Sequence, residues 1–287
     1  MKKIIFTFIF LFSIAVSAFC GGIGEMELVN SQEIRLNNIK DISVFYSSEN
    51  ISVFPGNSNN LVIHEYMTVD NSRYYAVIGS DADSVVVRKG RSPNSPFFRR
   101  RVEIFIPGSY LNALKIRTSS GVIETSDLIN SKISLETSSG NISVKSVKAG
   151  IIEIKSSSGR INIGAANGEA AVSTSSGNID LKLTGGTLNA RSSSGGINCT
   201  VDGNAGDLSF VTSSGSVRLN LPRNFQFNFS SRSSSGRLTA PFSDRLSHPF
   251  NNKNLTQGVI HNDTGSLGAI SDVNIRTASG SIAIEWI

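Results

Sequence analysis

The feature that most constrains this chain is a short run of residues that returns throughout its second half. The run begins with Thr or Ser, continues through two small residues to Gly, and has an aliphatic residue two positions later. The first regular copy is TSSGVI at residues 118–123, and the first seven glycines lie 18 to 21 residues apart. A fixed period of this length is typical of solenoids, in which each repeat forms one coil. The corner glycines are Gly121, Gly140, Gly159, Gly177, Gly195, Gly215, Gly236 and Gly280.

Both flanks of each corner glycine alternate between apolar and polar residues. Before Gly140 the apolar positions hold Ile133 and Leu135, and after it they hold Ile142 and Val144. A period of two predicts half-buried β-strands, with the intervening polar residues facing solvent. A helix would need apolar residues with a 3.6-residue period, and the repeats have no such stripe. The repeats are therefore predicted to contain strands and no helices.

The corner predicts how successive strands are joined. Glycine tolerates a positive φ, which the bend at Gly177 is expected to need, and small serines allow corners to stack. One coil has too little apolar surface to fold alone, so coils must stack in parallel about 4.8 Å apart. We therefore expect an all-β, single-stranded parallel β-helix (a β-solenoid) with about 18–21 residues per coil, right-handed by analogy. Ile142, Ile161, Ile179 and Ile197 would then form one buried ladder.

Residues 1–19 have the features of a signal segment. Two lysines precede an apolar run at residues 4–16, which is too short for a good membrane span. In one interpretation the segment is cleaved after Ala18. In the other, residues 17–20 form a lipobox with unusual Ser17 and Phe19, and Cys20 carries a lipid. Both interpretations predict export from the cytoplasm.

Two stretches depart from the regular repeat. Residues 28–107 contain alternating strands without the glycine period, and we expect irregular first coils that cap the solenoid and shield its edge. Residues 108–287 contain the regular coils, interrupted at residues 241–272. Either two coils with a blurred corner near Asn262–Gly265 or one coil with a long loop would fit there. The continuous repeat favours one domain, although the length of 287 residues would allow two.

Few residues have the spacing of a catalytic or metal-binding site. The two cysteines are Cys20 and Cys199, and Cys199 falls at an inward strand position, so we expect no disulfide. The three histidines have no metal-ligand spacing, so neither a metal nor a cofactor is expected. Three positions after the glycines, the acids Glu124 and Asp180 are separated by neutral residues, which provides no carboxylate pair for glycoside hydrolysis. We therefore do not expect an enzyme.

Charge limits the classes of partner. Loss of residues 1–19 removes two lysines and no acid, which lowers the formal net charge from +5 to +3. With so small an excess, and with aromatic residues that do not interleave with the basic ones, nucleic-acid binding is not expected. One outward column, four positions before the glycines, is nonetheless rich in Lys and Arg. In chain order this basic column contains Arg117, Glu136, Lys155, Ser173, Arg191, Val211, Arg232 and Arg276.

The basic column has two interpretations. Because stacking places neighbours about 4.8 Å apart, the alternating signs of Arg117, Glu136 and Lys155 would form only surface ion pairs. Alternatively, its basic residues form a track for an anionic envelope polymer or lipid headgroup, together with arginines of the basic loop at residues 91–101. The candidate track residues are Arg117, Lys155, Arg191, Arg232, Arg276, Arg99, Arg100 and Arg101.

The order of these features resembles a known family. The strand VEIFIP at residues 102–107 leads through Leu111 and Leu114 to the first regular corner, and corners continue to the C-terminus. This combination is similar to the bacterial "putative adhesin" β-solenoid family, a domain of unknown function, over roughly residues 40–287. The resemblance implies a cell-envelope β-helix and carries no catalytic residues. The chain departs from the family at residues 241–272 and at Asn50, near the corner of the first coil.

Three function classes follow. The first is an exported cell-envelope binding module, periplasmic or on the outer surface, whose long faces bind an envelope polymer or a protein partner as an adhesin would. The second is a structural or regulatory envelope scaffold that binds no ligand of its own. The third and least favoured is a polysaccharide-active enzyme. Contact with a membrane is expected only through a lipid on Cys20.

Overall fold

The computed structural model describes residues 25–242, 255–260 and 270–287, which form β-strands and one short 3₁₀ helix, η1 (Ser72–Tyr74). The prediction of an all-β protein is therefore confirmed. The strands are β1 (Glu27–Arg35), β2 (Asp41–Phe45), β3 (Asn50–Gly56), β4 (Asn60–Met67), β5 (Val77–Ser80), β6 (Ser84–Arg88), β7 (Arg100–Pro107), β8 (Ala113–Thr118), β9 (Ile123–Thr137), β10 (Ile142–Ser156), β11 (Ile161–Thr174), β12 (Ile179–Ser192), β13 (Ile197–Thr212), β14 (Val217–Leu221), β15 (Phe227–Ser233), β16 (Leu238–Thr239), β17 (Leu255–Ile260), β18 (Ser271–Thr277) and β19 (Ile282–Trp286).

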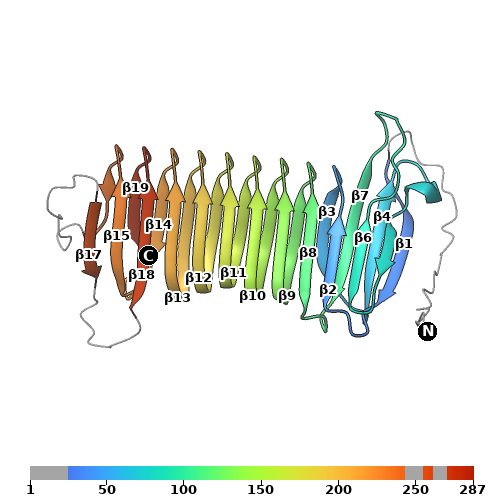
Figure 1. The fold of residues 1–287 in the computed structure, drawn as a ribbon, viewed down its shortest axis with the longest axis horizontal. Coiled ribbons are helices and arrows are strands. Elements are labelled where there is room, and N and C mark those ends of the chain that lie inside the picture. Colours follow the sequence, from blue (N-terminus) through green and yellow to red (C-terminus); the bar gives the residue numbers. More distant parts are fainter. Residues whose placement is uncertain (1–24, 243–254, 261–269) are drawn as a thin grey trace, which may run out of the picture.

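The centre of the molecule is a stack of regular coils. β9 to β13 each run from one corner to the next, and each pairs in parallel with its equivalent in the neighbouring coil. Figure 1 shows these strands side by side, with the corners in a line along one edge. Each coil contributes one layer before its corner and one after it, whose outer surfaces we call the pre-corner face and the post-corner face. The predicted parallel β-solenoid is confirmed, and its handedness stays a prediction.

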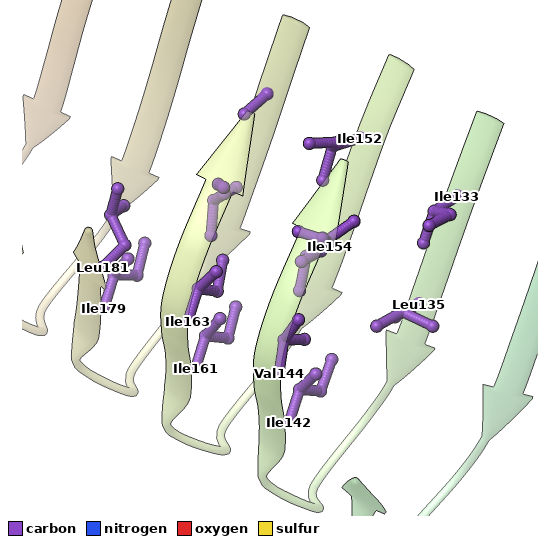
Figure 2. Packing of buried hydrophobic residues seen from close by; sticks show 14 of the residues in the cluster. Ile133, Leu135, Ile142, Val144, Ile152, Ile154, Ile161, Ile163, Ile179 and Leu181 are labelled. Carbon is purple, nitrogen blue, oxygen red and sulfur yellow. The ribbon is translucent and has the colours of Figure 1, made fainter. Parts of the chain in front are cut away.

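Apolar side chains of the two layers fill the space between them. Figure 2 shows these buried aliphatic side chains, including Ile142 and Ile161, on neighbouring coils. Ile142 lies opposite Ile161, Ile161 opposite Ile179, and Ile179 opposite Ile197. These four side chains are at most 1% exposed. The predicted isoleucine ladder is thus confirmed, and its burial supplies the hydrophobic stabilisation that no single coil could provide.

Close stacking, rather than an unusual φ, explains the corner glycines. Within the described residues, the glycines with positive φ are Gly168, Gly186 and Gly203, near the middle of β11, β12 and β13. At the corners, a Cβ on Gly177 would overlap the carbonyl oxygen of Gly159 in the preceding coil. The expectation of a positive φ at Gly177 is therefore wrong, and glycine is needed because another backbone passes where a side chain would lie.

The Thr or Ser that begins each corner closes it from inside. Thr137 is 2% exposed, and its Oγ1 accepts a hydrogen bond from the Gly140 amide at 3.1 Å. The same hydroxyl donates to the Gly121 carbonyl of the preceding coil at 3.4 Å. The amides of the two serines that follow both donate to one carbonyl of the preceding corner. Buried polar groups need such partners, so a hydroxyl residue at this position stabilises both its own corner and the stack.

At both ends of the stack the coils are out of sequence order. β18 lies between β13 and β15, and β19 lies between β14 and β16 (Figure 1). At the other end, β2 lies between β6 and β8, and β3 lies between β7 and β9. The line of corners consequently begins at Glu49, continues from Gly121 to Gly215, and reaches Gly280 before Gly236. The C-terminal coil is inserted into the stack and does not end it.

Antiparallel strands extend the stack at its ends. At the N-terminal end β4 pairs antiparallel with β1 and β7, and β5 pairs antiparallel with β6. At the other end β17 pairs antiparallel with β15, so residues 255–260 do not form a regular parallel coil within the interruption at residues 241–272. The corner expected near Asn262–Gly265, the expected signal segment at residues 1–19 and Cys20 lie outside the described residues.

Candidate functional site

The basic column lies on the pre-corner face, but its last two members are exchanged. Val211 of β13 lies opposite Arg276 of β18, and Arg276 lies opposite Arg232 of β15. This exchange follows from the insertion of the C-terminal coil. In spatial order the column therefore contains Arg117, Glu136, Lys155, Ser173, Arg191, Val211, Arg276 and Arg232.

Acidic neighbours offset the charge of the N-terminal half of the pre-corner face. Arg117 is 3.5 Å from Glu136, which also lies opposite Lys155. Further from the corner on the same face, Lys132 is 3.0 Å from Glu153, its diagonal neighbour in the next coil. These side chains are a third or more exposed, so each pair stabilises the fold by only about 0–1 kcal/mol. For this half, the interpretation as a ladder of surface ion pairs is the better one.

The C-terminal half of the same face carries three arginines whose adjacent outward ladder contains no acid, while Asp207 and Asp272 lie one outward ladder further from the corner. Arg191, Arg276 and Arg232 are exposed and, within the described part of the chain, form no ion pair. Arg191 donates from Nε to Asn189 Oδ1 at 3.0 Å. We call these three residues the arginine strip. The neighbouring outward ladder, two positions earlier in each strand, is neutral and contains Asn189, Ser209, Asn274 and Ser230.

The loop arginines do not extend this strip. The prediction that Arg100 belongs to the track is wrong. Its side chain is fully buried, 3.2 Å from a Glu49 oxygen and 3.8 Å from a Glu65 oxygen, so it cannot contact a surface ligand. Arg101 lies over the Tyr66 ring at 4.3 Å and forms an ion pair with Glu103 at 3.3 Å.

Arg99 is exposed, but it precedes β7 at the N-terminal end of the stack, whereas Arg232 lies in the last coil at the other end. The structure therefore does not bring the loop arginines and the arginine strip together.

The sequence did not predict the buried polar cluster around Arg100. Glu49 occupies the place of a corner glycine in the first coil, and Glu65 falls among the inward apolar residues of β4. Glu65 accepts hydrogen bonds from the Ala76 amide at 2.6 Å and from the Tyr46 hydroxyl at 3.2 Å. Burial raises the pKa of the Glu65 carboxyl, since desolvation outweighs these bonds and the nearby guanidinium. The sequence feature that could have revealed this cluster is Glu65, an acid at an inward position of a strand that otherwise alternates between apolar and polar residues.

Two shallow hollows lie on the post-corner face. The first, of about 430 Å³, is lined by Phe54, Glu124 and Lys145 among others, and the second, of about 310 Å³, by Asp180 and Arg218 among others. Glu124 and Asp180 are three strand spacings apart, roughly 14 Å. Glycosidase carboxyl groups are about 5–9.5 Å apart, so these two acids do not make such a pair.

Cys199 and the acidic residues form no further candidate site in the part of the chain that the structure describes. Cys199 is buried, and burial raises the pKa of its thiol, so the thiol stays protonated. In residues 25–242, 255–260 and 270–287 no three His, Cys, Asp or Glu side chains gather as metal ligands. Over the same residues, no helix is long and apolar enough to cross a membrane.

Comparison of the sequence with known protein families gives a match over most of the chain. The Toastrack DUF4097 family matches residues 32–285, nearly the whole described solenoid. The chain belongs to the Toastrack DUF4097 family. The resemblance to a β-solenoid family of unknown function is thereby confirmed. A search of curated proteins found no match.

Several solved structures are similar to this Toastrack chain. A "putative adhesin" from Bacteroides fragilis is 13% identical, with a TM-score of 0.49, and the match covers 93% of this chain and 100% of that one. A "putative adhesin" from Parabacteroides merdae is 16% identical, with a TM-score of 0.48 and coverages of 92% and 97%. A "putative lipid binding protein" from Parabacteroides distasonis is 12% identical, with a TM-score of 0.36 and coverages of 88% and 96%.

Proposed function

We propose that this Toastrack protein is an exported, non-catalytic binding module of the cell envelope, and that its arginine strip binds an anionic envelope polymer. Export rests on the signal segment at residues 1–19. The polymer class rests on the strip, because carboxylate, phosphate or sulfate groups are the partners that guanidinium groups prefer. The adhesin descriptions of the similar structures agree with a binding role.

One observation carries the proposal: Arg276 and Arg232 lie directly opposite one another on neighbouring parallel strands, and within residues 25–242, 255–260 and 270–287 neither forms an ion pair with an acid. Like charges one strand spacing apart destabilise a sheet. A purely structural face would be expected to alternate signs, as Arg117 and Glu136 do in the other half. A polyanion lying along the coil axis would contact Arg191, Arg276 and Arg232 in turn and remove this repulsion.

The competing functions have less support. A structural scaffold accounts for the paired half of the face but not for the unpaired half. An enzyme would need an acid and a base within reach of one substrate, and Glu124 and Asp180 lie roughly 14 Å apart.

The proposal is tested by affinity electrophoresis through gels containing heparin or polygalacturonate, with dextran as the uncharged polymer. We expect both anionic polymers, and not dextran, to retard the exported protein. A triple variant, Arg191→Gln/Arg276→Gln/Arg232→Gln, should bind at least about tenfold more weakly, if each exposed contact contributes roughly 0.5–1 kcal/mol.

A matched variant controls for net charge. Arg117→Gln/Lys132→Gln/Lys145→Gln also removes three cations, but each of these cations forms an ion pair with an acid of its own. We expect this control to bind like the wild type, within about twofold. Equal weakening by both variants would show that only net charge matters, and no retardation of the wild type would favour the scaffold.

A further inference from the structure

Two segments lie side by side at the N-terminal end of the solenoid. One is residues 68–75, after β4, and the other is residues 89–99, between β6 and β7. The Thr68 amide donates to the Arg99 carbonyl at 3.2 Å, and the Thr68 hydroxyl donates to the Phe97 carbonyl at 3.2 Å. Further along, the Arg91 amide donates to the Arg73 carbonyl at 3.1 Å. We call the two segments together the N-terminal tip. In Figure 1 the loop leading into β7 rises beyond the line of corners.

The N-terminal tip exposes two apolar side chains, and Met26, just before β1, exposes a third. Phe97 is 79% exposed, the largest exposed fraction among the large hydrophobic side chains that the structure describes, and Val69 is 47% exposed. Met26, 37% exposed, comes directly before Glu27, which lies opposite Met67 at the end of β4. These three residues are far apart in sequence, and their segments lie at the same end of the molecule.

The buried Arg100 holds the N-terminal tip in place. Its Nη2 donates to the Tyr74 carbonyl at 2.5 Å and to the Arg91 carbonyl at 2.9 Å, one from each segment. The rings of Tyr74 and Phe98 pack edge to face, with centroids 5.4 Å apart. Each segment is therefore fixed against the other, and Phe97 is presented without the entropy cost of ordering a free loop.

The N-terminal tip is also basic. Its two segments contain Arg73, Lys89, Arg91 and Arg99 and a single acid, Asp70. Asp70 already accepts a hydrogen bond from the Tyr75 hydroxyl. Arg73, Arg91 and Arg99 are exposed. The acids Glu25 and Glu27 lie at the start of β1 and partly offset this charge.

From this arrangement we infer that the N-terminal tip docks on the surface of an anionic lipid bilayer. Phe97, Val69 and Met26 would enter the headgroup region, as exposed apolar groups of peripheral proteins do, while the arginines contact anionic headgroups.

The position of the chain start agrees with docking. Glu25 comes five positions after Cys20, a distance of at most about 17 Å when extended. If Cys20 carries a lipid, the N-terminal tip is thereby held within reach of the bilayer, and docking would set the orientation of the solenoid on it.

Vesicle co-sedimentation of a chain that cannot be acylated tests the inference. We would export and purify the Cys20→Ser protein and mix it with phosphatidylcholine vesicles, with or without phosphatidylglycerol. We expect sedimentation with the anionic vesicles, at least about tenfold tighter than with the neutral ones, and weakening with salt. No binding to anionic vesicles, or equal binding to both kinds, would overturn the inference.

Variants separate the N-terminal tip from other surfaces. Phe97→Ser/Val69→Ser and, separately, Arg73→Gln/Arg91→Gln/Arg99→Gln should each reduce vesicle binding at least about tenfold. A matched apolar control is Ile129→Ser/Ile151→Ser, since these side chains are 61% and 42% exposed on the regular coils. A matched charge control is the arginine strip variant.

Both controls should bind vesicles like the unsubstituted chain, and unchanged melting temperatures would show that all four variants fold. Loss of binding in the strip variant but not in the tip variants would assign the vesicle contact to the strip and overturn docking by the tip. The polymer gels remain a separate test, because dextran, heparin and polygalacturonate contain no lipid.

Discussion

A glycine at each corner leaves room for the carbonyl group of the neighbouring coil. Any side chain there would have to push two coils apart, and each coil is held at both of its faces. The Thr or Ser three positions before each glycine is needed for an equally specific reason, since Thr137 bonds within its own corner and to the preceding one. At this scale the repeated Ser-Ser-Gly run is explained by backbone packing, without any ligand.

Gly177→Ala tests this explanation. The new Cβ would overlap the Gly159 carbonyl oxygen, and overpacking of this kind destabilises a protein by about 1–3 kcal/mol. Gly108→Ala is the control, because a Cβ on Gly108 meets no atom within 4 Å. Thermal unfolding should show a clear loss for the first variant and little change for the second, and equal melting temperatures would contradict close stacking at the corner.

The strand register is tested by two neighbouring substitutions. Ile179 is 0% exposed, so Ile179→Asp would bury a carboxylate without a partner and should cost several kcal/mol. Asn178 is exposed, and its Oδ1 accepts a hydrogen bond from the Gly196 amide at 2.9 Å. Asn178→Asp keeps an acceptor at that place and should be tolerated. Urea unfolding of the two variants measures the difference, and similar losses would mean that the register is wrong.

The Glu65 carboxyl gives a pH-dependent prediction. Burial raises its pKa above the ordinary value of 4.5, so its contribution to stability is present below that value and is lost as the pH rises through the folded-state pKa. Compared with Glu65→Gln, the wild type should therefore become less stable as the pH rises above about 4.5. Urea midpoints over this range measure the difference, and a relative gain of the wild type with rising pH would refute the prediction.

Among the elements, β18 and β19 have the least usual position. Although they end the chain, each lies between two other strands, so both strand edges are paired. β2 and β3 have the equivalent place near the start. Among the described residues, the strands that lie at the ends of the stack are antiparallel or, like β16, short, as expected for protected edges.

Hydrogen exchange should show this arrangement. Amides of β18 and β19 should exchange as slowly as those of β13, although they are within 17 residues of the C-terminus. β17, whose one partner among the described residues is β15, should exchange faster. Rapid exchange throughout β18 and β19 would contradict the inserted coil.

The elements also show what the sequence could and could not predict. The alternation around Gly140 and the glycine spacing are local signals, so they predicted the strands, the parallel stack and the Ile142 ladder. The exchange of Gly236 and Gly280 is not local, because the 44-residue interval between them is compatible with either order. Arg100 was assigned to the surface because its two buried acids, Glu49 and Glu65, lie far from it in sequence.

At the scale of the whole molecule, the two proposed contacts lie at opposite ends. The arginine strip ends at Arg232, seven strand spacings or about 34 Å from Arg117, whereas the N-terminal tip lies at the other end of the stack. A solenoid that docks through Phe97 would thus hold its strip away from the bilayer. The stack of coils between them would then act as a spacer.

The most direct test of the central claim, that the arginine strip binds an anionic polymer, is the salt dependence of heparin binding, measured by titration calorimetry. Between ionic strengths at which the Debye length is about 10 Å and about 3 Å, wild-type affinity should fall steeply. The Arg191→Gln/Arg276→Gln/Arg232→Gln variant should bind weakly throughout and show a shallower dependence. Heparin binding that is insensitive to salt, or that has the same salt dependence in both proteins, would contradict the account.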